Sequence, residues 1–513
     1  MLEIFLKLKS SDLASGSEFV PAINTLPREL LEQIFEHVGC AECRISEYQA
    51  TCKAPDTHTI STVCTLWHDI ILSSPFLWRN IYVRGNEDWR PRNEDRLLPH
   101  VLRFSKDVDL NITLDFARYN LLDARRKPTE SLLPLFAECH RWKTLRISKM
   151  ISQGSRNDVG FIAEALGTGE ASRLHRLRSV VIEVLQDRQM SKALQSAPNI
   201  QKLIVFISVQ PNQHLQSDED SSAYPALRTL VADSFSVLSG SKQECWMDSV
   251  QTLQMEIDNR CHHPLPVTPV CFDFPSLKIL SIAIQRHPYN PIADSRYVSE
   301  TNTPLLPQEY PSFLTSVLSR ISDAPRIRTL ILGWKEVQDF RKDRAAPHIQ
   351  FQPLYAFIER NGGALTQLSI ANLFLDPKEL CSLLTVIPSL ELLKIEEANV
   401  GEVGGIWAFN PKLAMITSPF LSFLTVTRDS DIFPEPPLPH LRHIVLVVNE
   451  FYDEAFTSMV LSRWTARDSI DTLARVELTL GGYGDLSQTK FCQDFCRFES
   501  VILKDRTGRR IVA

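Results

Sequence analysis

The sequence predicts an α/β protein in which a small all-α unit precedes a long, irregular solenoid with a curved parallel sheet. Two amphipathic segments, residues 23–35 and 60–83, predict the helical unit. From residue 142 onward a short pattern, apolar-x-x-apolar-x-apolar, returns many times and predicts the sheet. A chain of 513 residues is too long for one simple core, and usual domain sizes allow about three domains.

The first amphipathic segment has the pattern of one helix. Pro27 suits the opening turn, where a missing N–H costs little, and Glu29 complements the positive end of the helix dipole. Apolar residues then recur at helical spacing on one face, while charged and polar residues fill the other. The apolar residues are Leu26, Leu30, Leu31, Ile34, Phe35 and Val38.

The second segment repeats this pattern and then breaks. Its apolar face consists of Val63, Leu66, Trp67, Ile70 and Ile71. The run Ser73-Ser74-Pro75 ends the helix, and the aromatic pair Phe76 and Trp78 follows the break. A unit this small cannot hide so many large apolar groups within itself. We therefore expect part of this surface to contact another protein.

The two segments together resemble the F-box family. The resemblance rests on three ordered blocks within residues 21–84, namely Leu26-Pro27-x-Glu29-Leu30-Leu31-x-x-Ile34-Phe35, Val63-Cys64-x-x-Trp67 and Ser74-Pro75-x-Leu77-Trp78. It implies that this box docks on the Skp adaptor of a cullin-type ubiquitin ligase. The sequence departs from the family pattern in residues 39–59, a longer connection between the first two blocks. The alternative is that both segments are ordinary core helices of a helical domain.

The resemblance also implies which residues contact the adaptor. They belong to the first block and to the two later blocks, at or just behind the docking surface. The residues are Leu26, Pro27, Leu30, Leu31, Ile34, Phe35, Val63, Trp67, Leu77 and Trp78.

The repeated pattern is too short for a helix face, and its last two positions have the period of two that is typical of a strand. Amphipathic stretches such as residues 313–321 and 380–387 precede several copies, which predicts stacked helix–strand units that share one core. The clear copies start at Trp142, Leu177, Ile200, Leu227, Val250, Leu277, Ile327, Leu365, Leu390, Leu421, Leu441 and Leu473. A further copy lies in the C-terminal tail, within residues 491–503.

Most of these copies lie about 20 to 35 residues apart, which resembles the period of leucine-rich repeats. They are irregular, because the asparagine that lies just beyond the strand in many such repeats comes close in one unit, at Asn372, and most units lack it. The chain resembles the large fungal F-box families. The competing fold is an ordinary α/β domain with a doubly wound sheet.

These patterns divide the chain into four parts. Residues 1–20 are expected to form a flexible leader, and residues 21–84 an F-box with the atypical insertion 39–59 that acts on its own. Residues 85–130 are a linker with a candidate first repeat, a helix and strand within 95–116. Residues 131–513 are the leucine-rich-repeat-like solenoid.

Composition excludes several classes of function. A net charge of −6 and a pI near 6.1 argue against a nucleic-acid partner. No window approaches the run of about 18 apolar residues that a membrane span requires. The N-terminal residues, interrupted by Lys7 and Lys9, make a poor signal peptide, and the 11 scattered cysteines favour a reducing setting. We therefore expect a cytoplasmic or nuclear protein.

No catalytic constellation appears in the sequence, and we expect neither catalytic residues nor a cofactor. The best metal candidate is the pair Cys40 and Cys43 with Cys52 and His58. Cysteine and histidine are suitable zinc ligands, but their spacing matches no common zinc module. We therefore expect no metal here.

The resemblance to F-box proteins implies a substrate receptor of a Skp–cullin–F-box ubiquitin ligase, with the repeats binding an unknown target protein. The alternative is an F-box interaction scaffold that acts outside any ligase. Enzymatic activity in the repeat half is a third alternative, which the absence of catalytic motifs from the sequence disfavours.

Overall fold

The computed structural model divides the chain into two compact units, residues Met1–Leu177 and Arg178–Ala513. The described residues are 22–39, 43–45, 57–84, 94–115, 129–148, 162, 174–182, 194, 197–205, 225–232, 247–258, 271–286, 310–336, 349–397, 402–403, 406–407, 414–426, 437–449, 451–465, 471–480, 490–495, 498–504 and 509–510.

Unit 1 begins with short helices that match the two amphipathic segments. They are η1 Ala22–Thr25, α2 Arg28–Gly39, α3 Thr57–Ser61, α4 Thr65–Ser73 and η2 Pro75–Trp78. Pro27 lies just before α2, and its carbonyl accepts the N–H groups of Leu30 and Leu31 at 3.0 and 3.1 Å. Ser74 separates α4 from η2, as the predicted break requires.

A parallel sheet begins within the same unit, in the order β1 Cys43–Ile45, β2 Asn80–Arg84, β3 Leu110–Asp115 and β4 Trp142–Ser148. Helix α5 Glu94–Phe104 leads into β3, and α6 Thr129–Ala137 with η3 Cys139–Arg141 leads into β4. The predicted helix and strand within residues 95–116 are therefore present. The sequence did not predict β1 and β2. Because β2 pairs with β3, the helical region does not stand apart from residues 94–148.

Unit 2 continues with parallel strands whose order follows the chain. They are β5 Ser179–Ile182, β6 Lys202–Val205, β7 Thr229–Ala232, β8 Thr252–Asp258, β10 Ile279–Arg286, β12 Thr329–Glu336, β13 Gln367–Ala371, β14 Leu392–Glu396, β17 His443–Val448, β18 Arg475–Leu480 and β19 Val501–Lys504. A doubly wound sheet reverses its strand order at a switch point. The order in unit 2 shows no such reversal among the described strands.

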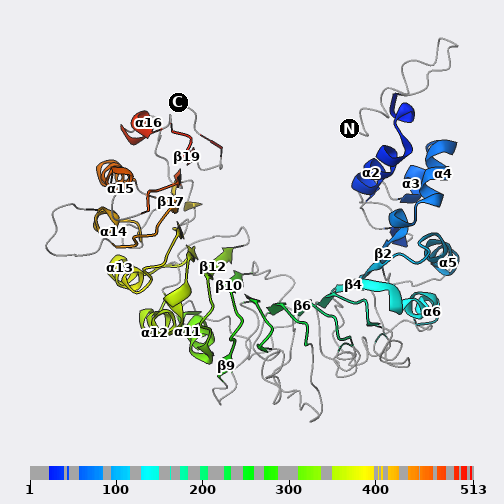
Figure 1. The fold of residues 1–513 in the computed structure, drawn as a ribbon, viewed down its shortest axis with the longest axis horizontal. Helices are drawn as coiled ribbons and strands as arrows, with labels where there is room; N and C mark the ends of the chain where they lie inside the picture. The colour runs from blue at the N-terminus through cyan, green and yellow to red at the C-terminus, as the bar shows by residue number, and fades with distance from the viewer. Residues whose placement is uncertain are drawn as a thin grey trace. The chain divides into compact units, whose positions relative to one another are not determined.

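Helices cover one side of this sheet in the later part of unit 2 (Figure 1). They are α11 Tyr310–Arg320, α12 Phe351–Asn361, α13 Pro377–Thr385, α14 Ser418–Leu424, α15 Asp453–Thr465 and α16 Lys490–Phe495. A short helix, η7 Gly362–Ala364, follows α12. Two small sheets lie beside these elements: β9 Phe272–Asp273 pairs with β11 Ile321–Asp323, and β15 Glu402–Val403 pairs antiparallel with β16 Ile406–Trp407.

The last two positions of the apolar triplets form continuous core rows across neighbouring strands. Leu280, Leu330 and Leu368 are register partners, and all are fully buried. The residues between these positions alternate to the opposite face, as the period of two requires. Eleven of the twelve predicted triplets lie at strands of the sheet in this way.

The triplet that starts at Leu421 is the exception, and its prediction as a strand is wrong. Leu421 and Leu424 lie on α14 instead, which ends at Leu424. The hydroxyl of Thr417 accepts the N–H of Phe420 at 3.4 Å and caps the helix. The i and i+3 positions of a triplet also share a helix face, so Leu421 and Leu424 are buried from a helix here.

Candidate protein-docking site

The helices of residues 22–78 are joined by aromatic packing. The rings of Phe35 on α2 and Trp67 on α4 lie 4.7 Å apart between centroids. The indole Nε1 of Trp67 donates a hydrogen bond to the Asn24 Oδ1 of η1 at 2.9 Å. Because the indole has both an apolar contact and a partner for its N–H, it holds all three elements together.

The last block of the motif fixes this helical region to the next element. Trp78 is 6% exposed, and its Nε1 donates to the carbonyl of Ile71 at 2.8 Å. Its ring lies 5.1 Å from the ring of Phe104 on α5. The hydroxyl of Thr57 donates to the carbonyl of Leu77 at 3.2 Å. Leu77 and Trp78 are therefore part of the core of the helical region.

Polar contacts hold α2 beside the break after α4. The hydroxyl of Ser74 donates to Glu32 Oε1 at 2.6 Å, and Arg28 Nε donates to the same oxygen at 3.1 Å. These hydrogen bonds lower the pKa of Glu32 because they favour its charged form, and the bond from Ser74 has the largest effect. Arg79 Nη2 lies 2.6 Å from Glu36 Oε1 one turn further along α2.

The ten predicted contact residues separate into a buried and an accessible set. The buried set, at most 7% exposed, is Leu31, Phe35, Trp67, Leu77 and Trp78. The accessible set is Leu26, Pro27, Leu30, Ile34 and Val63, of which Leu26 and Ile34 are half-buried. Only accessible side chains have surface to contribute to a partner, so the buried set belongs to the core of the helical region.

Two further apolar side chains extend the accessible set. Leu66, on α4, is 40% exposed, and Phe76, on η2, is 58% exposed. Both lie in the apolar pattern of the second segment, but the family motif does not include them. Exposure of several large apolar groups within one small region is typical of a protein-interaction surface. We call Leu26, Pro27, Leu30, Ile34, Val63, Leu66 and Phe76 the apolar docking set.

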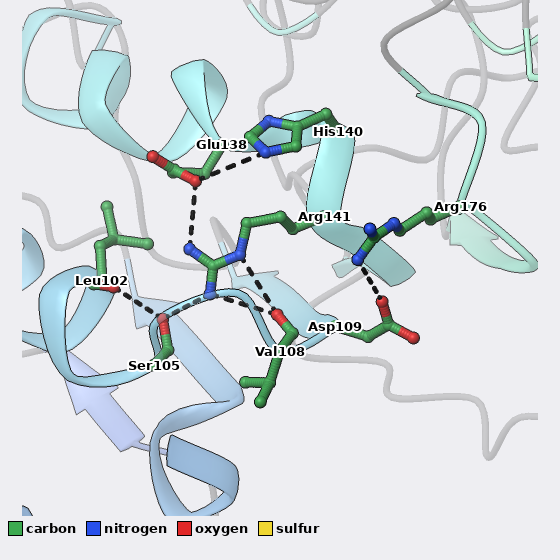
Figure 2. A network of polar contacts seen from close by, with 8 residues as sticks. All are labelled: Leu102, Ser105, Val108, Asp109, Glu138, His140, Arg141 and Arg176. Carbon is green, nitrogen blue, oxygen red and sulfur yellow. Dashed lines mark hydrogen bonds and ion pairs between the residues drawn. The ribbon is translucent and has the colours of Figure 1, made fainter.

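A buried arginine lies further along unit 1, and Figure 2 shows its contacts. Arg141, 4% exposed, donates from Nε and Nη2 to the carbonyl of Val108, both at 3.2 Å, and from Nη2 to Ser105 Oγ at 2.8 Å. Its Nη1 lies 3.1 Å from Glu138 Oε2, which is also 4.0 Å from His140 Nε2. This network ties the turn after α5 to the start of β4, a structural role, because every contact of the guanidinium is internal.

The described part of the chain shows no candidate metal centre. No group of three metal-binding side chains occurs there. Cys40 and Cys52 lie outside the described residues, and only the backbone of Cys43 and His58 is described. Among the described residues, no helix has the length and apolar character needed to cross a membrane.

Comparison with known proteins addresses the first unit. No curated protein matches the chain. Residues 23–84 match the family model described as F-box-like, and this range covers the three ordered blocks and the apolar docking set. The chain therefore carries an F-box-like domain at residues 23–84.

Proposed function

We propose that this protein is a substrate receptor of a Skp–cullin–F-box ubiquitin ligase, acting in the cytoplasm or nucleus. The observation that carries the proposal is the coincidence of the F-box-like match with accessible apolar side chains on α2 and α4. F-box domains bind Skp-type adaptors and act mainly within such ligases. A surface of this kind needs a partner to remove its apolar groups from water.

In this proposal residues 131–513 form an irregular, leucine-rich-repeat-like solenoid that binds the target protein. Support comes from the strand order of unit 2, which follows the chain, and from the apolar rows that each strand adds to one core. The opposite face of these strands carries no covering helix in the described part, where α11 to α16 lie on one side (Figure 1).

The proposed mechanism is proximity rather than side-chain catalysis. The F-box docks the chain on the adaptor, and the adaptor joins it to a cullin that holds a ubiquitin-conjugating enzyme. A bound target then presents its lysines at a high effective concentration. F-box domains typically serve as adaptor or receptor modules without catalytic activity, and the proposal assigns no reaction step to this chain.

Affinity purification of the tagged full-length chain tests this function. We expect both the Skp adaptor and a cullin to co-purify, whereas the adaptor without a cullin would indicate a scaffold outside any ligase. The double substitution Leu26→Ala and Pro27→Ala should weaken adaptor binding about tenfold or more, since full burial of a large apolar side chain contributes about 1.5–3 kcal/mol and Leu26 is already half-buried in the free chain. Lys143→Ala, exposed on β4, is the control.

A double variant that keeps the circular dichroism spectrum of the wild type and binds the adaptor equally well would remove the docking assignment. Absence of adaptor from the wild-type purification would do the same.

A further inference from the structure

The residue that precedes each strand in unit 2 takes part in a regular backbone ladder. The carbonyl of Arg178 accepts the N–H groups of Gln201 and Lys202 at 2.8 and 3.0 Å. The carbonyl of Gln201 accepts the backbone N–H of Arg228 at 2.9 Å. The same pattern continues through Gln251, Lys278 and Arg328. These positions therefore lie side by side at one edge of the sheet, about 4.8 Å apart from strand to strand.

Four of these six ladder positions are basic. We call Arg178, Arg228, Lys278 and Arg328 the basic row; they precede β5, β7, β10 and β12, and all are exposed. None of them forms an ion pair among the described residues, and Lys278 Nζ donates only to the Gln251 side chain, at 3.2 Å. The row is thus a line of unpaired positive charge.

The surrounding turns do not neutralise this line. The described turn residues 198–201, 225–228, 248–251, 275–278 and 325–328 include one exposed acid, Asp248, and one further exposed base, Arg326. The row places Lys278 and Arg328 on the neighbouring strands β10 and β12, where like charges repel and weaken a sheet. A partner that carries negative charge would relieve this repulsion.

The basic row also has a defined end. The next ladder position is Thr366, which is neutral, and the one after it is Glu391, which is negatively charged. Arg442 follows, but its Nη2 is paired with Asp471 at 3.1 Å. The basic row therefore stops at β12 and spans five strand steps from β5, about 24 Å.

We propose that the basic row binds an extended acidic segment of a protein. Alternate strands lie about 9.6 Å apart. A segment in the extended polyproline II conformation rises about 3.1 Å per residue with three residues per turn, so every third side chain points the same way at nearly the matching distance. Carboxylates at positions i, i+3 and i+6 would reach Arg178, Arg228 and Lys278. The inference rests on the proposed function only in taking this segment to belong to the target.

A protein segment fits the row better than a nucleic acid does. The turns listed above contain no aromatic residue on which a base could stack. The whole chain has a net charge of −6, which opposes long-range attraction of a polyanion. A short acidic peptide contacts only the basic row, and it carries too few negative charges to be strongly repelled by the rest of the chain.

Fluorescence anisotropy with the purified full-length chain tests this inference. The probe is a labelled ten-residue peptide with glutamate at every third position and serine or alanine elsewhere, and its matched control has glutamine in place of glutamate. We expect binding of the glutamate peptide alone. The variant Arg228→Gln, Lys278→Gln and Arg328→Gln should bind it about tenfold more weakly, since each exposed pair contributes a factor of a few. Arg442→Gln, at the same ladder position but outside the row, should leave binding unchanged.

Three outcomes would overturn the inference: equal binding of the two peptides, full binding by the triple variant, or tighter binding of a single-stranded oligonucleotide that the same substitutions abolish. The triple variant should melt no lower than the wild type, because these exposed charges have no ion-pair partners. Adaptor binding should be unchanged in it. If the wild type does not bind the adaptor, the proposed function is refuted, whereas binding of the acidic peptide to the basic row is unaffected.

Discussion

Neighbouring leucines on α2 allow a strict test of the docking site. Leu30 is 45% exposed and Leu31 is 1% exposed. A double substitution of accessible residues, Leu30→Ala with Val63→Ala, should reduce adaptor binding without unfolding the domain. Leu31→Ala should do the reverse, because its side chain faces the core and has no surface left for a partner.

The magnitudes follow from these exposures. Full burial of a leucine or valine contributes about 1.5–3 kcal/mol. Leu30 and Val63, at 45% and 42% exposed, have nearly half of that surface available. Each therefore contributes about 1 kcal/mol on docking, and the pair weakens binding about thirtyfold. Leu31→Ala instead lowers the free energy of unfolding by about 2–5 kcal/mol.

The assay combines two measurements on each full-length variant. Calorimetric titration with the purified Skp adaptor gives the dissociation constant, and urea denaturation gives the free energy of unfolding. The accessible pair should change the first quantity and Leu31→Ala the second. If the accessible pair binds the adaptor as the wild type does, the partition into docking and core residues is refuted.

Two further predictions concern stability. Arg141→Met should lower the free energy of unfolding by about 3 kcal/mol, because it removes the donors to Val108 and Ser105 and the ion pair with Glu138. Lys143→Met, exposed on β4, should change this free energy by less than about 0.5 kcal/mol in the same urea titration. Truncation after residue 484 removes α16 and β19 and exposes the edge of β18, so we expect aggregation in size-exclusion chromatography; a soluble product with unchanged melting temperature would contradict this.

Strand positions in unit 2 were predictable because they depend on a local pattern. Each triplet places two apolar residues two apart, and both face the core, as Leu393 and Ile395 do on β14. The position of α14 was not predictable from that pattern alone. Leu421 and Leu424 satisfy both a strand and a helix, and Pro419 with the cap at Thr417 decides for the helix.

The helices of residues 22–78 and their F-box-like character were predictable from the sequence, but the exposure of individual side chains was not. An amphipathic pattern places Leu30 and Leu31 on the same apolar face, and it does not say which of them a neighbouring helix covers. The packing of α2 against α3, α4 and η2 makes that choice. The strand β2 was missed because the aromatic block directly before it, which ends at Trp78, dominates the pattern.

The basic row shows why charge must be judged by register rather than by composition. A net charge of −6 correctly describes the whole chain, but it averages over both faces and all edges of the sheet. Arg178, Arg228, Lys278 and Arg328 each follow the first apolar residue of a triplet. Once the triplets are known to be strands in parallel register, that shared offset places all four charges at one edge. The local potential there is positive even though the molecule is acidic, and local potential is what an approaching acidic segment meets within a Debye length of about 8 Å.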